Sequence, residues 1–130
     1  MRITATEAQT QKACMDLLAA ERIFALRLNS GAVKDKRGVP VYFARWTDGS
    51  PAAGVADVLA LPVFLRLAGP GPIVMVPSIK VVWIECKAAT GQRKTQREFQ
   101  ARVEAEGHTY LIVRDAAELQ AWLRERRGRA

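Results

Sequence analysis

The sequence predicts a single α/β domain in which helices flank a central β-sheet. The length of 130 residues suits one domain, because domain sizes cluster at about 100–150 residues. Helical and strand-like hydrophobic periodicities alternate along the chain. With 49% hydrophobic and 25% charged residues, the composition is that of a globular protein. We therefore expect residues 1–130 to form one domain.

The N-terminal part is expected to hold one helix and two strands. Thr6-Glu7-Ala8-Gln9 has the spacing of a capping box and predicts a helix over residues 6–22. The alternating apolar residues from Ile23 to Leu28 predict a strand, which Asn29-Ser30-Gly31 ends as a turn. Aromatic and β-branched residues predict a second strand from Val39 to Trp46.

Two apolar runs that carry charged residues are predicted to be central strands. Gly54 to Leu61 contains one acid, Asp57, in an otherwise apolar sequence. Ile79 to Ala88 is the second run and ends in an acid and a lysine. Between them, residues 62–78 are rich in proline and glycine, which predicts an irregular insertion or a loose hairpin.

The C-terminal part predicts a helix, a strand and a second helix. Thr95-Gln96-Arg97-Glu98 and Asp115-Ala116-Ala117-Glu118 each have capping-box spacing, and the first of these helices should run to Glu106. His108 to Arg114 predicts the intervening strand. Because a helix connects them, this strand should pair in parallel with the strand from Ile79 to Ala88.

The charge balance makes nucleic acid the leading partner class. Lys and Arg number 20 against 13 Asp and Glu, which gives a formal net charge of +7, and such a surplus attracts phosphate backbones. A basic surface that only confers solubility is the alternative. We expect no membrane span, because proline, glycine and arginine interrupt the longest apolar stretch, Leu59 to Val76. Cys14 and Cys86 lack metal-ligand spacing, which suggests a reduced, cytoplasmic chain.

The aromatic residues and the one histidine are expected to be structural. Trp46, Trp83 and Trp122 follow the periodicity of core residues more than that of a stacking platform. His108 lies alone at the start of a predicted strand, so we assign it no catalytic role.

Asp57, Glu85 and Lys87 are the residues that could perform chemistry. Phosphodiester hydrolysis uses a divalent cation held by hard oxygen ligands, and Mg²⁺ is usually bound by one or two carboxylates with water and phosphate. Asp57 and Glu85 could supply the carboxylates. Lys87 shares a strand face with Glu85 and could orient a water or stabilise developing charge. The structural alternative is an acid satisfied by backbone donors at 57 and a surface Glu85–Lys87 ion pair worth at most about 1 kcal/mol.

Several motifs follow one another in an order that is itself informative. They are Glu7, Asn29-Ser30-Gly31, Gly54-Val55-Ala56-Asp57, Trp83-Ile84-Glu85-Cys86-Lys87, Gln96 and Ile112-Val113-Arg114. Their order and spacing resemble the PD-(D/E)XK nuclease superfamily, and within it the VRR-NUC (virus-type replication and repair nuclease) family, over most of the chain. The chain departs from the family at Ala56, where members often have proline, and in the length of the insertion 62–78.

The resemblance implies a restriction-endonuclease-like fold, with a mixed central β-sheet flanked by α-helices. It also implies that Asp57, Glu85 and the backbone carbonyl of Cys86 bind Mg²⁺ or Mn²⁺. Lys87 would position the attacking water.

Two further residues would complete the implied site. Glu7 would contribute to a second metal or hold a water, and Gln96 would orient the lysine or contact the phosphate. The alternatives are an acid that stabilises a helix N-terminus at Glu7 and an ordinary first-turn residue at Gln96.

The resemblance further implies a homodimeric, structure-specific endonuclease that cuts four-way DNA junctions in the cytoplasm of a bacterium or of a phage-infected host cell. Basic residues near the site would contact the DNA backbone: Lys34, Lys36, Arg37, Arg45, Arg93, Lys94 and Arg97. The basic tail from Arg124 could do the same or simply be solvated. The insertion 62–78 could supply a dimer surface, grip substrate as a flap, or extend the sheet.

Three other functions stay open at this point. The chain could be a general or flap-type DNA nuclease, or a non-catalytic DNA-binding module that keeps the fold. A metal-dependent hydrolase of small phosphorylated molecules is the third, although it would not need so many cations.

Overall fold

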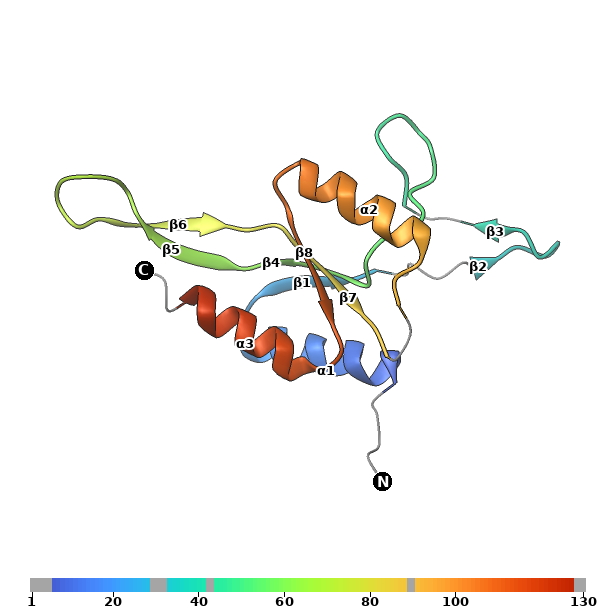
Figure 1. Ribbon diagram of the computed structural model, residues 1–130, viewed down its shortest axis with the longest axis horizontal. Coiled ribbons are helices and arrows are strands. Elements are labelled where there is room, and N and C mark those ends of the chain that lie inside the picture. The colour runs from blue at the N-terminus through green and yellow to red at the C-terminus, as the bar shows by residue number, and fades with distance from the viewer. Residues whose placement is uncertain (1–5, 29–32, 42–43, 89–90, 128–130) are drawn as a thin grey trace, which may run out of the picture.

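The computed structural model of the protein describes residues 6–28, 33–41, 44–88 and 91–127, and Figure 1 shows its elements. The predicted turn Asn29-Ser30-Gly31 lies outside the described residues. Within them, three helices flank a mixed sheet, so the predicted α/β class is confirmed.

The central sheet has four strands in the order β1, β4, β7, β8. They are β1 (Phe24–Arg27), β4 (Val58–Leu61), β7 (Val82–Cys86) and β8 (Thr109–Val113). β4 runs antiparallel to both β1 and β7, whereas β7 and β8 are parallel. The predicted parallel pairing through a crossover helix is therefore confirmed.

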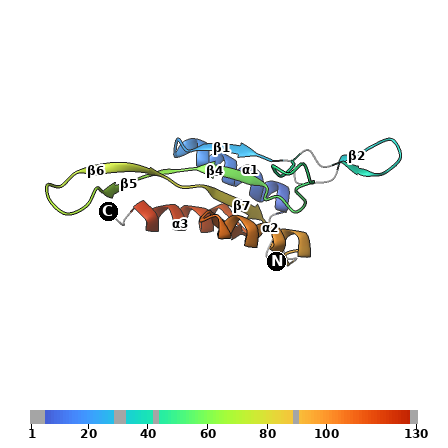
Figure 2. The ribbon, with the colours of Figure 1, turned by 90° about the horizontal axis from the view of Figure 1, so that it is seen from above.

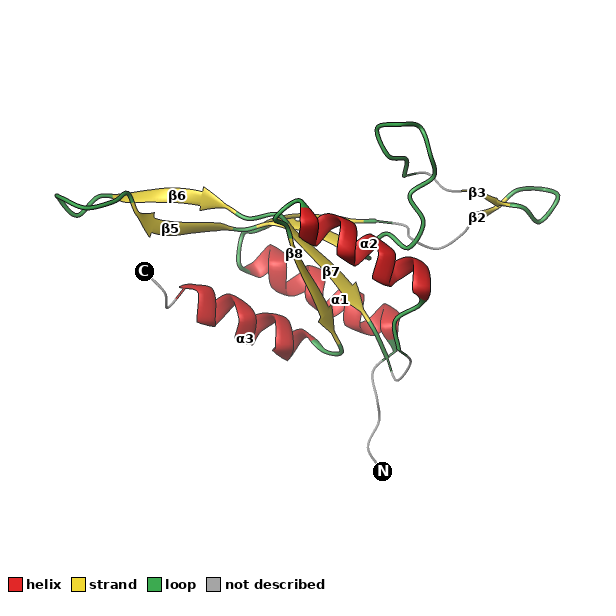
Figure 3. Cartoon of the chain, turned by 45° about the horizontal axis from the view of Figure 1, so that its top comes forward, coloured by secondary structure: helices red, strands yellow, loops and turns green. Residues whose placement is uncertain are grey.

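Helices cover both faces of this sheet (Figure 3). They are α1 (Glu7–Ala20), α2 (Lys94–Ala105) and α3 (Ala116–Arg127). α1 and α3 bury residues such as Leu18 and Leu119 against Ile84 on one face. α2 packs Phe99 against Trp83 on the other face, with ring centroids 5.0 Å apart. Each face of the sheet thus has its own core.

Residues 62–78 form a hairpin, which is the second of the two predicted possibilities, and its pairing is regular rather than loose. Its strands are β5 (Val63–Leu67) and β6 (Met75–Ile79), paired antiparallel throughout. The β4–β7 ladder ends at Ala60↔Val82 and the β5–β6 ladder starts at Val63↔Ile79, with two residues on each strand between them. Since the Lys80 N–H donates to the carbonyl of Pro62 there, at 3.0 Å, the two ladders form one hairpin of unbroken register. Figure 2 shows its outer half projecting from the body.

The predicted strand from Val39 to Trp46 is much shorter in the structure. Strand β3 (Pro40–Val41) pairs with β2 (Val33–Lys34) in a small ribbon, and residues 42–43 lie outside the described part. Beyond them, the Trp46 N–H donates to Ser50 and the Ala52 N–H to Ala44. The chain therefore turns back on itself at this point, which prevents a longer strand.

The starts of the helices are set by side-chain caps. At α1 the predicted capping box is confirmed, because Thr6 and Gln9 exchange two hydrogen bonds of 2.9 and 3.1 Å. The predicted cap at Thr95 is wrong, because α2 begins at Lys94. The side-chain carbonyl of Gln96 accepts from the Arg93 N–H at 2.8 Å. Gln96 reaches back to the residue before the helix, so the helix begins earlier than the Thr95 spacing suggested.

The third predicted cap, at the start of α3, is confirmed at one of its two bonds. The Asp115 carboxylate accepts from the Glu118 N–H at 3.0 Å. The Glu118 carboxylate accepts from the N–H of Arg114 instead of that of Asp115, at 3.2 Å.

The three tryptophans and His108 make packing contacts and hydrogen bonds within the domain. Trp46 stacks on Phe99 at 5.7 Å, and His108 accepts a hydrogen bond of 3.0 Å from the Trp83 indole. Trp122 packs edge-on against a phenylalanine of β5, with 5.9 Å between centroids. The two cysteines are free and buried. In the described part of the chain, no helix is long and apolar enough to cross a membrane.

Candidate active site

A cavity of about 240 Å³ opens where β4 begins and β7 ends. Ten residues line it: Glu7, Gln11, Arg27, Leu28, Asp57, Glu85, Cys86, Lys87, Arg93 and Gln96. They come from the first two turns of α1, the end of β1, the residue before β4, the end of β7 and the start of α2. The cavity thus brings together all six residues predicted for the catalytic and metal site, although 89 positions separate the first from the last (96 − 7).

Asp57 lies immediately before β4 and not within it. Its backbone carbonyl accepts from the Leu28 N–H at 2.7 Å, and one of its carboxylate oxygens accepts from the Cys86 N–H, also at 2.7 Å. The side chain is 8% exposed. A backbone donor therefore does satisfy part of this carboxylate, and an ionised carboxylate has about four acceptor positions in all.

Gly54 allows the loop before β4 to lie directly against the start of α2. It adopts a positive φ of +71°, and a Cβ at this position would lie 2.3 Å from the backbone carbon and oxygen of Thr95. Only glycine combines that backbone conformation with so close a contact. The motif Gly54-Val55-Ala56-Asp57 therefore begins with the residue that lets the acid lie beside the start of α2.

Glu85 is the most deeply buried acid of the site, at 1% exposure. The hydroxyl of Tyr110 donates a short hydrogen bond to its Oε2 atom. Burial raises the pKa of Glu85, and the negative charge of nearby Asp57 adds to that rise. The Tyr110 hydrogen bond and the positive charge of Lys87 oppose it. The carboxylates at 57 and 85 are thus close enough to repel each other, which is the electrostatic situation that a divalent cation relieves.

Tyr110 is a site residue that the sequence reasoning missed. Gln92 donates to its hydroxyl at 3.4 Å and to the Gln100 side chain at 2.9 Å, so the tyrosine belongs to a small polar network behind Glu85. Burial, followed by the hydrogen bond to Glu85, raises the pKa of the Tyr110 hydroxyl. The register of the parallel pair, which the sequence alone does not give, places Tyr110 opposite Trp83 and so on the same sheet face as Glu85.

Lys87 is 4% exposed and follows directly on β7. Its backbone N–H continues the ladder by donating to Val113 at 3.0 Å, which fixes the base of the side chain. Glu85 and Lys87 are therefore not a surface ion pair, because both are buried beside one cavity.

Glu7 and Gln96 complete the cavity wall from two helices. Glu7 is half-buried in the first turn of α1, and Gln96 is 5% exposed at the start of α2. The side-chain carbonyl of Gln96 accepts from the Arg93 N–H, and the NH₂ of the same amide is a hydrogen-bond donor. Cys86 turns the other way: its thiol meets Cys14, and this contact and burial raise the pKa of Cys86.

The donor atoms suit a hard divalent cation. Within the described residues, no group of three or more His, Cys, Asp and Glu side chains could hold a metal ion. Mg²⁺ sites, however, commonly use one or two carboxylates and complete their coordination with water, backbone carbonyls and phosphate. Asp57 and Glu85 with the Cys86 carbonyl match that donor set.

Five of the seven predicted DNA-contacting residues fall into two groups. Arg93, Lys94 and Arg97 are exposed on the first turn of α2, beside the cavity, and Arg93 lines it. Lys36 and Arg37 are exposed in the turn of the β2–β3 ribbon, which projects beyond the same end of α2 (Figure 1).

The contacts of these basic residues are weak or local. Ion pairs join Lys94 to Glu98 at 3.8 Å and Arg37 to Asp35 at 3.7 Å, both near the surface. Arg45 donates to the Gly49 carbonyl at 3.0 Å. The Lys34 side chain lies outside the described part of the structure.

No protein-family model matches the chain, and neither a curated protein nor a solved structure matches it significantly.

Proposed function

We propose that the chain is a metal-dependent DNA endonuclease of the PD-(D/E)XK superfamily, similar to VRR-NUC proteins, with a restriction-endonuclease-like fold. The observation that carries the proposal is the burial of Asp57, Glu85 and Lys87, which are 8%, 1% and 4% exposed, at one cavity. Burying charged groups costs stability unless they are well paired, and well-packed apolar residues would often be as stable or more so. A chemical role explains why the fold keeps these three residues at this place.

In this proposal Asp57, Glu85 and the backbone carbonyl of Cys86 hold Mg²⁺ or Mn²⁺. When bound, the ion supplies Lewis-acid stabilisation of the phosphate and acidifies a bound water. Lys87 donates hydrogen bonds that orient the attacking water and stabilise negative charge on the phosphoryl oxygens. Tyr110 holds one oxygen of Glu85 in place from behind.

The two outer residues receive more specific roles from the geometry. Gln96 donates its NH₂ to a phosphate oxygen, while its side-chain carbonyl accepts from the Arg93 N–H and so fixes the orientation of the amide. Glu7, at the mouth of the site, holds a water or contributes to a second metal.

DNA is the substrate that fits the charge of the molecule. The net charge is +7, Arg93 lines the cavity, and Lys94 and Arg97 are exposed on the same turn of α2, where they could contact the DNA backbone. A homodimer that cuts four-way junctions, in the cytoplasm of a bacterium or phage-infected cell, is our specific form of the proposal. A general or flap-type nuclease is the nearest alternative, while a non-catalytic DNA-binding module would not explain the buried acids.

The test is a cleavage assay on labelled four-way junction, flap and linear duplex DNA, with Mg²⁺, Mn²⁺ or EDTA. Asp57→Asn and Lys87→Ala are compared with matched exposed controls, Asp16→Asn and Lys12→Ala, whose residues form a surface ion pair of 2.9 Å. We expect symmetric nicks in the junction alone, lost in EDTA and in both site variants but retained in both controls.

Other outcomes separate the alternatives. Cutting of all three substrates would leave a general nuclease. A wild-type protein that binds DNA but cuts nothing with either metal would contradict the enzymatic proposal and favour the binding module.

A further inference from the structure

One face of the long hairpin is made of apolar side chains alone. Side chains alternate along a strand, and the register from β4 through β5 and from β6 into β7 is unbroken, so every second residue shares this face. β1 contributes to it because its residues pair directly with β4. We call this set the apolar face: Phe24, Leu26, Leu59, Leu61, Val63, Leu65, Leu67, Met75, Pro77 and Ile79.

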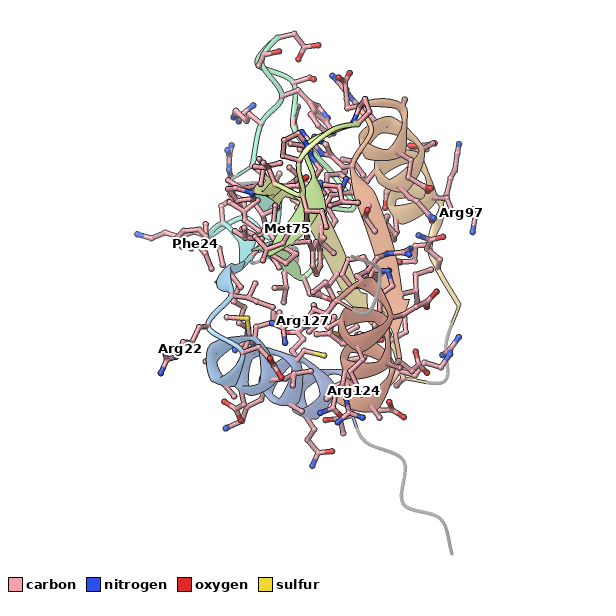
Figure 4. All side chains as sticks on the ribbon, turned by 90° about the vertical axis from the view of Figure 1, so that its left-hand side faces the viewer. Arg22, Phe24, Met75, Arg97, Arg124 and Arg127 are labelled. Carbon is pink, nitrogen blue, oxygen red and sulfur yellow. The ribbon has the colours of Figure 1, made fainter. Side chains whose placement is uncertain are left out.

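The apolar face is open to solvent. Seven of its large side chains are between 36% and 66% exposed, the extremes being Met75 and Ile79. α2 lies on this side of the sheet but packs over β7 and β8, and so leaves β1 and the hairpin uncovered. In Figure 4, which looks onto the hairpin, Phe24 and Met75 lie away from α1 and α3, on the far side of the sheet from Arg124.

The opposite face of the same hairpin packs against α3 and carries polar as well as apolar residues. Phe64 packs edge-on against Trp122 of α3, and the remaining positions include Arg66, Ser78 and Lys80. The hairpin is thus strongly two-sided, with a mixed face that packs against α3 and an apolar face whose β5 and β6 side chains are largely exposed. Soluble monomers rarely expose a contiguous apolar patch of this extent without a partner.

We infer that the apolar face is the surface through which two copies of this chain associate. Seven large side chains at about half exposure offer on the order of 600 Å² per copy, which approaches the ~800 Å² per partner of a standard interface. The ten residues of the face include no charge, although the chain carries +7. Two copies can therefore approach here with little repulsion, whereas an acidic partner would find nothing to pair with.

A flat apolar face also suits self-association about a two-fold axis, because the same patch then covers itself on both copies. Burial of these side chains supplies the driving force without any specific polar match. The face lies toward the hairpin end of the strands, whereas the cavity lies at the end where β7 finishes. Association through this face leaves both cavities open.

The experiment measures mass in solution by light scattering after size exclusion, without DNA or divalent metal. We expect the wild type to have twice the chain mass of 14.3 kDa at tens of micromolar. Leu65→Glu and Ile79→Glu place a charge on the apolar face at side chains 58% and 66% exposed, so the monomer fold should tolerate them. Each should weaken the dimer by roughly 100-fold or more, because the charge would be buried without a partner.

Arg66→Glu is the matched control, since it introduces the same side chain on the opposite face of the hairpin. It should remain dimeric, and far-ultraviolet circular dichroism should show all variants folded. A monomeric wild type, or a dimer that both face variants leave intact, would overturn the inference. If a monomeric wild type instead sediments with neutral phosphatidylcholine vesicles, the face belongs to a lipid surface. None of these outcomes depends on nuclease activity. A monomeric wild type would also contradict the homodimeric form of the proposed function, whereas the cleavage assay tests the catalytic site independently.

Discussion

A carboxylate oxygen of Asp57 accepts a 2.7 Å hydrogen bond from the backbone N–H of Cys86, the residue between Glu85 and Lys87. The acid that precedes β4 is thereby tied to the end of β7. This bond fixes the position of the first carboxylate relative to the strand end that carries the second carboxylate and the lysine.

Replacing Asp57 separates this structural role from a chemical one. Asp57→Asn keeps an oxygen that can accept from Cys86, so we expect a folded protein whose nicking activity falls by about 100-fold or more. Asp57→Ala also leaves the buried N–H without a partner, which should cost a further ~1–3 kcal/mol in the free energy of unfolding. Urea denaturation checks the second value and the cleavage assay the first. Equal stability of the two variants would contradict the structural role.

Tyr110→Phe tests the network behind Glu85. The ring contact with Phe99, at 6.3 Å between centroids, is retained, but the buried carboxylate loses the hydrogen bond from the hydroxyl. The free energy of unfolding should fall by about 1–3 kcal/mol at neutral pH, and activity should fall with it. A variant as stable and as active as the wild type would show that the hydroxyl does not support Glu85.

The pH dependence of stability should reveal the burial of Glu85. Its pKa in the folded protein lies above the ordinary value, so the folded state favours the neutral form. The contribution of this group to stability is therefore full below the unfolded-state pKa and is lost as pH rises through the folded-state pKa. We expect Glu85→Gln to raise the melting temperature in EDTA more at about pH 8 than at about pH 4. A difference of the same size at both values would contradict this.

Divalent metal should stabilise the protein through the same two carboxylates. At ten times its dissociation constant, a bound ion adds about 1.4 kcal/mol, which corresponds to a few degrees in the melting temperature of a domain of this size. Mn²⁺ and Mg²⁺ should therefore raise the melting temperature of the wild type and of Asp16→Asn, but not of Asp57→Asn. An equal shift in Asp57→Asn would place the metal elsewhere.

Gly54→Ala should disturb the packing of α2 on the loop before β4. The added Cβ would lie 2.3 Å from Thr95 backbone atoms, and the positive φ adds strain. Gly49→Ala is the control, because Gly49 also has a positive φ, of +87°, but nothing within 4 Å of its Cβ position. Thermal unfolding should show a loss of about 2 kcal/mol or more for Gly54→Ala beyond that of the control. Similar losses would mean that the contact with Thr95 is soft.

Much of the site could be predicted from the sequence because its residues lie at element ends with clear patterns. Glu85 and Lys87 end an apolar strand, and alternation alone puts them on one face. Tyr110 could not be found in the same way, because its contact with Glu85 depends on the register between two strands joined through a helix. The sequence predicts the start of α2 two residues too late. Gln96 follows Arg93, and Glu98 follows Thr95, at the same spacing of three residues, so local spacing does not choose between the two starts.

The hairpin was harder to predict than the site. Proline and glycine within residues 62–78 left an irregular insertion and a loose hairpin both open, and regular pairing was not expected. Pro77 nevertheless lies within β6, opposite Leu65, on a strand that pairs only with β5 among the described residues. An edge strand does not need every N–H for pairing, so the proline is tolerated there. Exposure of the apolar side chains was also not visible in the sequence, where such residues predict burial.

The unbroken register of this hairpin constrains how its length can change. One residue inserted on a single strand between Leu61 and Val63 would turn every side chain beyond it to the other face, so that Phe64 would leave Trp122 and leucines would point at α3. Two residues added to each strand, by contrast, would lengthen the arm by one full pleat and preserve both faces. Among relatives of this protein, the two strands of the hairpin should therefore differ in length by equal and even numbers of residues. The segments of β4 and β7 next to Asp57 and Glu85 should keep the same number of residues.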